Sequence, residues 1–182
     1  MKKIRIVPHH RNNHKDRFCR NNIRFLQNTK QFDANKIYLI ADWSVSAVSI
    51  SIFSNGNVDF LRYQSIETSS RNWTYRTDET DNNIYSYNGN IEEYKIQLTD
   101  QVMELERILN FYRFSLHKGE KSVDTIILLG DNPEMESINR QMTNTVDTPI
   151  IVIDDAFVQQ LYPQFSAKHC ALIGLALKEE SL

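Results

Sequence analysis

The spacing of apolar and polar positions predicts three consecutive strands. Residues 37–41 form a short continuous apolar run, which is typical of a strand buried on both faces. Residues 45–53 alternate between aliphatic side chains and serines, which indicates a strand with two different faces. Asn55-Gly56 then marks a tight hairpin, because both central residues of a type I′ turn need positive φ. We expect the returning strand over residues 57–66, so that all three strands are antiparallel.

The next stretch lacks a clear period. Residues 67–89 are rich in Ser, Thr, Asn, Asp and Tyr, so we predict a long polar loop. Its aromatic side chains are a candidate contact surface for a partner, because aromatic residues anchor interfaces. This surface comprises Trp73, Tyr75, Tyr85 and Tyr87. The alternative is an ordinary solvated loop with a few rings folded inward.

The remainder alternates helices and strands. Apolar residues recur every three or four positions over 98–116, which predicts a long helix with a core-facing stripe. A coiled-coil seam is the alternative, but the stripe covers fewer than three heptads. Residues 123–129 and 150–153 are short apolar runs expected to be buried strands, and residues 166–180 are expected to form a closing helix.

Polar turns follow these last two strands. Asp131 or Asn132 is expected to cap a helix whose first position is Pro133. Asp154 or Asp155 is expected to cap another helix in the same way.

The predicted order is three antiparallel strands, a long helix, a strand, a helix, a strand and closing helices. This order is typical of an α/β fold of ribonuclease H-like type, a five-stranded mixed sheet with helices on both faces. In that fold the fourth and fifth strands run parallel to the first. We assign residues 37–182 to this domain, and residues 1–36 to a basic N-terminal arm or short helix.

The charge is distributed unevenly along the chain. The net charge is -2, but residues 1–36 carry ten Lys and Arg against two Asp. Such a segment is attracted to anionic lipid, nucleic acid or an acidic partner, or it packs on the chain's own acidic domain.

Cysteine usage and hydropathy set two further bounds. Cys19 and Cys170 lie far apart and outside any CxxC or metal-type spacing, which argues against a disulfide framework and a zinc site. No run reaches the roughly 18 apolar residues that a membrane span needs, and no apolar signal segment follows the basic N-terminus. We therefore expect an intracellular protein.

Three segments resemble the C-terminal half of the PilM family of type IV pilus assembly proteins, which are cytoplasmic members of the actin-like ATPase superfamily. LIADWSVSAVSISIFSNGNVDFLR resembles the family's hairpin with Asp at the bend. LERILNFYRFSL and VDTIILLGDNPEMESINRQM resemble its long helix, next strand and nucleotide turn. TPIIVIDDAF and KHCALIGLALKEE resemble its last strand and closing helix. Together the segments extend over residues 37–180.

The resemblance implies a nucleotide cleft. Asp42 matches the Asp that helps to place the metal and the phosphates in actin-like ATPases, so it is the expected metal ligand. Ser44 and Ser46 lie where small residues let the backbone approach the phosphates. Gly130 and Asp131 match the nucleotide turn. ATP and Mg²⁺ are the ligands that such a cleft would take if it is retained.

This chain departs from the family's pattern at two points. Trp43 follows Asp42 where the family has a small residue, and we expect its bulk to crowd a phosphate. Only Gly130 remains of the glycine-rich turn, and the carboxylate of Asp131 would repel a phosphate chain. We therefore expect a degenerate cleft without efficient ATP hydrolysis. Alternatively, Asp42 only stabilises the hairpin by bonding backbone amides or the hydroxyls of Ser44 and Ser46.

The resemblance also implies a partner. Family members dock a short N-terminal tail of a membrane protein of the PilN type, which needs a groove and no catalytic residue. We predict a noncatalytic cytoplasmic scaffold of pilus or related secretion assembly, peripheral to the inner face of the membrane. The basic arm would lie against anionic lipid. The sequence leaves self-association open.

Two other classes of function compete with this prediction. Asp42, Asp131 and Asp154 or Asp155 follow predicted strands, so with Glu104 or Glu106 they could hold Mg²⁺ for a ribonuclease H-like nuclease. Nucleic-acid binding through the basic arm, where phenylalanines lie between cations, is a weaker alternative because no reading helix or ribbon is recognised.

Overall fold

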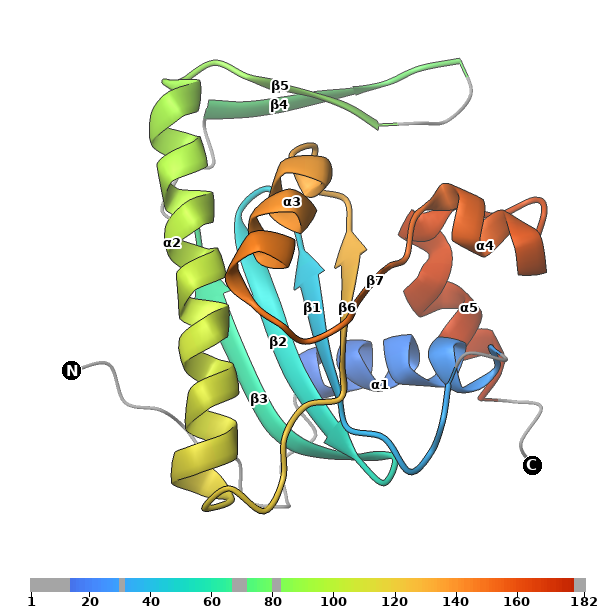
Figure 1. The fold of residues 1–182 in the computed structure, drawn as a ribbon. Coiled ribbons are helices and arrows are strands. Elements are labelled where there is room, and N and C mark those ends of the chain that lie inside the picture. The colour runs from blue at the N-terminus through green and yellow to red at the C-terminus, as the bar shows by residue number, and fades with distance from the viewer. Residues whose placement is uncertain (1–13, 30–31, 67–71, 80–82, 179–182) are drawn as a thin grey trace.

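The computed structural model describes residues 14–29, 32–66, 72–79 and 83–178 (Figure 1). Within them lies a five-stranded sheet of order β3-β2-β1-β6-β7. Strands β1 (Tyr38–Trp43), β2 (Ala47–Ser54) and β3 (Asn57–Ser65) are antiparallel, while β6 (Thr125–Gly130) and β7 (Ile150–Val152) run parallel to β1. The predicted mixed α/β sheet is confirmed.

The turn between β2 and β3 has the geometry that its sequence predicts. Asn55 and Gly56 have φ values of 52° and 72°. Positive φ at both central positions is the signature of a type I′ turn, whose twist matches that of the flanking strands. This turn fixes the register of the hairpin, in which Ser54 lies opposite Asn57.

Helices cover both faces of the sheet, so β1 is buried on both sides. One face packs on α2 (Ile91–Asn110) and α3 (Met135–Thr145) through alternate residues of β1, namely Leu39, Ala41 and Trp43. The other face packs on α1 (His14–Gln27), α4 (Asp155–Leu161) and α5 (Cys170–Ala176). Asp42 lies on this second face because successive side chains of a strand point to opposite sides.

The basic segment before β1 contains a helix that belongs to the core. Ile23, Phe25 and Leu26 of α1 are buried against the sheet, and α1 lies beside α5. The contact is close at Gly174, because a Cβ there would overlap the backbone of Asn21. Of the two alternatives given for residues 1–36, an arm or a short helix, the helix is present over His14–Gln27. Residues 1–13 of the predicted basic arm lie outside the described residues.

The prediction of a long loop over residues 67–89 is wrong for the part of this range that the structure describes, residues 72–79 and 83–89. Two strands, β4 (Trp73–Thr77) and β5 (Asn83–Tyr87), form a separate antiparallel hairpin. Figure 1 shows this hairpin crossing above the ends of β1 and β6. Its cross-strand pairs are mainly polar or aromatic, such as Trp73 opposite Tyr87 and Tyr75 opposite Tyr85. The segment therefore pairs without the aliphatic alternation on which the prediction relied.

Helix α2 continues into a π-helix, η2 (Phe111–Leu116). Two side chains from η2 and the residue after it meet one carboxylate of β3. The Tyr112 hydroxyl donates to Asp59 Oδ2 at 2.8 Å, and His117 Nε2 lies 3.1 Å from the same oxygen. Burial, together with the Asp59 carboxylate, raises the pKa of Tyr112.

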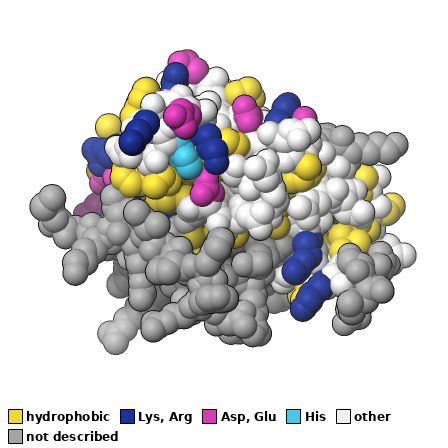
Figure 2. All heavy atoms as spheres, turned by 90° about the horizontal axis from the view of Figure 1, so that it is seen from below, with side chains coloured by type: hydrophobic (Ala, Val, Ile, Leu, Met, Phe, Trp, Pro, Cys, Tyr) yellow, Lys and Arg dark blue, Asp and Glu magenta, His cyan; other side chains and the backbone are white. Residues whose placement is uncertain are grey.

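Figure 2 shows the molecule from below. On this surface, basic and acidic side chains lie intermingled around a histidine.

Of the two helices that follow β6 and β7, one begins later than predicted and the other begins where predicted. Helix α3 starts at Met135, not at Pro133, because the Asn132 side chain accepts from the Glu134 amide within a preceding turn. Asp154 caps α4 as expected, accepting from the Phe157 amide at 2.8 Å. The predicted single closing helix is divided into a 3-10 turn, η3 (Ala167–His169), and α5.

Candidate functional site

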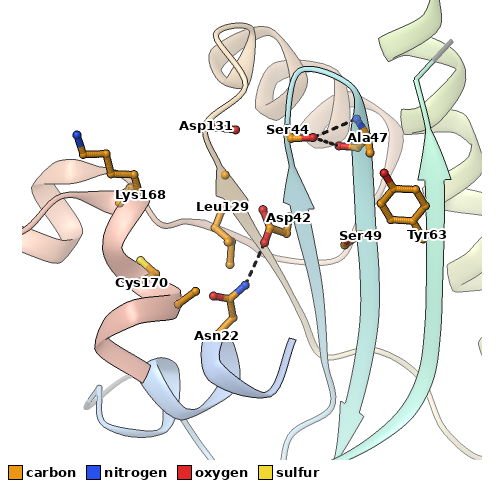
Figure 3. Close-up of a pocket in the computed structure, with 13 residues that line it drawn as sticks. Asn22, Asp42, Ser44, Ala47, Ser49, Tyr63, Leu129, Asp131, Lys168 and Cys170 are labelled. Carbon is orange, nitrogen blue, oxygen red and sulfur yellow. Dashed lines mark hydrogen bonds between the residues drawn. The ribbon is translucent and has the colours of Figure 1, made fainter. Parts of the chain in front are cut away.

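A pocket of about 330 Å³ opens beside the carboxyl ends of β1 and β6 (Figure 3). Strand ends of this kind are where open α/β sheets place their ligands. The lining residues come from α1, β1 and the bend after it, β2, β3, β6 and the turn that follows, η3 and α5. They are Asn22, Asp42, Ser44, Ala47, Ser49, Tyr63, Leu129, Gly130, Asp131, Ala167, Lys168, Cys170 and Ala171.

The register of the sheet explains part of this lining. Leu129, Asp42, Ser49 and Tyr63 lie directly opposite one another in β6, β1, β2 and β3. Residues paired in register project from the same face of a sheet, so the four side chains form one row across it. The pocket thus follows from strand pairing, with α1 and α5 closing its other side.

Asp42 is the carboxylic acid of this row. Its Oδ2 accepts a hydrogen bond of 3.1 Å from the Asn22 side chain of α1. Burial raises the pKa of Asp42 from 3.8 to about 7, the Asn22 hydrogen bond opposes the shift, and the charge of Asp131 adds to it. The Asp42 carboxyl therefore changes charge near neutral pH.

Asp42 was expected, as one alternative, to bond backbone amides or the hydroxyls of Ser44 and Ser46, and the structure shows a different partner. Its partner is Asn22, which is distant in sequence, whereas Ser44 bonds within its own bend. The Ser44 hydroxyl donates to the Ala47 carbonyl and accepts from the Ala47 amide, both at 3.1 Å. Ser46 is exposed and does not line the pocket; its carbonyl accepts from the Ile66 amide. Of the two serines, only Ser44 belongs to the site.

The turn after β6 is shaped by Gly130. Its φ is 128°, and a Cβ there would overlap the carbonyl oxygen of Trp43. That same oxygen accepts hydrogen bonds from the amides of Asp131 and Asn132, at 3.0 and 3.2 Å. Two consecutive amides of the turn are therefore used within the protein, whereas a phosphate loop directs its amides at the ligand.

Trp43 does not crowd the pocket, so that expectation is wrong. The Trp43 side chain is fully buried in the core formed with α2 and α3, on the face opposite Asp42. Strand alternation separates the two neighbours, and the sequence prediction had placed both at a bend. The carboxylate of Asp131, in contrast, does line the pocket as expected.

A buried asparagine anchors the turns that form one edge of the pocket. Asn132 Nδ2 donates to the Ser44 carbonyl at 2.8 Å and to the Tyr94 hydroxyl at 2.7 Å. The Tyr94 hydroxyl in turn donates to the Val45 carbonyl at 3.2 Å. Sequence analysis treated Asn132 only as a helix cap; its side chain instead ties the bend after β1 to the turn after β6.

Four lining residues carry no local signal in the sequence. Asn22, Tyr63, Lys168 and Cys170 lie on α1, β3, η3 and α5, and only the tertiary fold brings them beside Asp42. Burial, aided by the charge of Asp42, raises the pKa of Cys170 to about 12. The thiol therefore stays protonated at neutral pH and is a poor nucleophile.

The four aromatic residues proposed as a contact surface divide into two groups. Trp73 and Tyr87 pack against Tyr94 and the core, with ring centroids 5.0 and 5.4 Å from that of Tyr94. Tyr75 is 70% exposed. The Tyr85 hydroxyl donates to Asp131 Oδ2 at 2.6 Å, so the hairpin meets the rim of the pocket.

Of the carboxylates named for a magnesium-dependent nuclease, Asp42 and Asp131 line the pocket, but Asp154, Asp155 and Glu104 do not. Glu104 pairs with Arg62 at 2.9 Å on the α2 face of the sheet. Asp154 caps α4, and Asp155 accepts from the Ala167 amide at 2.8 Å. Across the described part of the chain, no three His, Cys, Asp or Glu side chains gather so as to hold a metal ion.

The fold has a known counterpart. No family model and no curated protein matches the sequence. The structure is similar to a chain of the PilM–PilN type IV pilus biogenesis complex, with a TM-score of 0.54 and 14% identity. The match covers 90% of this chain and 50% of that chain, so this chain spans about half the length of its counterpart. A PilM-like fold is confirmed; membership of the family stays a prediction.

Removal of the Tyr85 hydroxyl tests the link between hairpin and pocket. In Tyr85→Phe we expect β4 and β5 to open more often, because the bond to Asp131 is lost. The expected cost is about 1 kcal/mol, the usual worth of one hydrogen bond. Hydrogen exchange should quicken at the amides of β4 and β5 and stay unchanged in β1 and β2. Equal protection of the hairpin in both proteins would contradict the link.

Proposed function

We propose that this chain is a noncatalytic scaffold in the assembly of type IV pili or of a related secretion system. In this role it docks the cytoplasmic tail of a membrane partner of the PilN type. The observation that carries the proposal is the fold shared with a chain of the PilM–PilN complex over 90% of the present chain. The proposed location is the cytoplasm, at the inner face of the membrane. No helix among the described residues is long and apolar enough to cross a membrane.

The chemistry of the pocket supports a noncatalytic role. Asp131 lines it, and its carboxylate would repel a phosphate chain. Amides that a phosphate loop would offer are bonded to Trp43 instead. Both features oppose the binding of an anionic nucleotide.

The β4–β5 hairpin is the proposed docking surface for the tail. Tyr75 is exposed there, while Trp73 and Tyr87 anchor the hairpin on α2 through Tyr94. Exposed aromatic side chains on a rigid support are typical anchors of interfaces, since they bury a large area with little loss of conformational entropy.

Binding of a tail peptide tests the scaffold role. The probe is a synthetic peptide with the sequence of the N-terminal cytoplasmic tail of a PilN-type protein from the same genome, titrated calorimetrically into the full chain. We expect saturable binding that Tyr75→Ala weakens about fivefold or more. The matched control is Phe114→Ala, which removes a ring that is 58% exposed in η2, the π-helix that follows α2. Absence of binding, or equal losses in both variants, would contradict the proposed surface.

Residual nucleotide binding is the second candidate function. It is favoured by the pocket at the carboxyl ends of β1 and β6, which brings Asp42, Ser44, Gly130 and Asp131 together. Titration with ATP and Mg²⁺ decides between the two. We expect no saturable heat at millimolar nucleotide, whereas micromolar binding that Asp42→Ala abolishes would reopen the catalytic interpretation.

A further inference from the structure

The pocket contains a buried hydrogen-bond acceptor that has no partner among the described residues. Asn22 is 2% exposed, yet its side-chain oxygen has no hydrogen-bond partner among the described residues. In Figure 3 the Asn22 amide nitrogen faces Asp42, while the oxygen is turned toward the side of the pocket where Cys170 lies. An unsatisfied buried acceptor is costly, and a ligand that donates a hydrogen bond would remove the cost.

Two carboxylates line the pocket at the carboxyl ends of β1 and β6. They belong to Asp42 and Asp131. Lys168 lines it from η3, but Figure 3 shows its ammonium group directed away from Asp42. The pocket is therefore complementary to a group that carries several donors and a positive charge.

We propose that this pocket receives one basic side chain, arginine or lysine, from the tail that the scaffold docks. The inference rests on the proposed function and names the chemistry by which the tail is held. A guanidinium group suits the site best, because its planar set of donors reaches both a carboxylate and a neighbouring carbonyl oxygen. An ammonium group would satisfy fewer of these acceptors at once.

The proposed docking surface is continuous with the pocket. The Tyr85 hydroxyl donates to Asp131, which lines the pocket together with Asp42 of the strand β1. Tyr75 and Tyr85 are cross-strand partners whose ring centroids lie 6.3 Å apart. A tail lying on the exposed ring of Tyr75 is thus directed toward the rim of the pocket, where its basic side chain enters.

Binding of a cation here should depend on pH. Burial holds the pKa of Asp42 at about 7, and a bound cation would lower it by favouring the ionised carboxylate. Affinity should therefore rise as the pH increases through 7 and level off above it, with about a tenfold change per pH unit below the pKa. The other titratable side chains that line the pocket are Asp131, Tyr63, Lys168 and Cys170.

The test uses the full chain and a small probe, N-acetyl-arginine amide. Nuclear magnetic resonance follows the side-chain amide of Asn22 during titration at pH 8. We expect saturable shifts with this probe, and about tenfold weaker binding or more with N-acetyl-citrulline amide, which has the same shape without the charge. Asp42→Asn should abolish the response, whereas Asp147→Asn, a neutralisation at an exposed site, should preserve it.

Several outcomes would overturn the inference. Citrulline binding as strong as that of arginine, persistence of the response in Asp42→Asn, or affinity independent of pH would each do so. If Asp42→Asn does not fold, the comparison of the two probes and the pH dependence decide alone.

The tail peptide separates this inference from the proposed function. A tail that binds equally well after its basic residues are changed to alanine would leave the scaffold role standing and refute the basic-side-chain pocket. A tail that fails to bind, while the arginine probe responds as expected, would refute the PilN-type partner and retain the pocket.

Discussion

Replacement of Asp42 by asparagine is expected to stabilise the protein by about 2 to 4 kcal/mol at pH 8 and to change little at pH 4. Burial raises the pKa of Asp42 from 3.8 to about 7 in the folded chain. Between these values the folded chain holds a proton that the unfolded chain has released, so the wild type loses stability as the pH rises. Asparagine has nearly the same shape and carries no charge to desolvate, which removes that loss.

Thermal unfolding of both proteins at pH 4 and pH 8 measures this effect. The stabilisation should appear as an increase in Tm of about 5 to 15 °C at pH 8. Asp147→Asn serves as the control, because Asp147 is exposed and the substitution removes the same charge. If the Tm difference between Asp42→Asn and the wild type were the same at both pH values, burial of the Asp42 carboxylate would not be what destabilises the folded protein.

Replacement of Gly130 by alanine is expected to cost more than about 4 kcal/mol or to prevent folding. The substitution combines two penalties, since φ at Gly130 is 128° and a Cβ would overlap the Trp43 carbonyl oxygen. Strands β1 and β6 pair at this point in the middle of the sheet, so the backbone has no room to move aside. Loss of their pairing would also separate Asp42 from Asp131.

Urea unfolding of Gly130→Ala and Gly119→Ala separates the two penalties. Gly119 also has positive φ, 86°, but a Cβ there would have no heavy atom within 4 Å. Only the backbone penalty applies to it, about 1 to 2 kcal/mol. Similar losses in the two variants would mean that the close approach of β1 and β6 is not what requires glycine.

The raised pKa of Asp42 bears on function as well as on stability. A buried carboxylate that destabilises the folded chain at neutral pH is expected where a ligand supplies a compensating positive charge. Groups with perturbed pKa values concentrate at functional sites. Among the described residues of α1, Asn22 donates a hydrogen bond to this carboxyl. The proposed basic side chain of a docked tail would complete this environment, which connects the stability experiment with the binding experiments.

The linear pattern of residues was sufficient for most of the sheet. Continuous apolar runs marked β1 and β6 because both faces of these strands are covered by helices. The Asn55-Gly56 turn was recognisable because few other pairs accept two positive φ values. The β4–β5 hairpin was missed because its pairs are polar and aromatic, and because its packing on Tyr94 is a contact distant in sequence.

The sequence by itself determined the chain order of the strands in the main sheet, the turn at Gly56, a helix cap at Asp154 or Asp155 and the position of Asp42 near the carboxyl end of β1. These features depend on local periodicity and on the backbone preferences of single residues. Only the tertiary structure decided that Asn22 bonds Asp42, that Trp43 points away from the pocket, and that the Gly130 turn uses its amides internally. Such features depend on which elements meet in space, and burial then sets the charge of Asp42 through the solvent that those elements exclude.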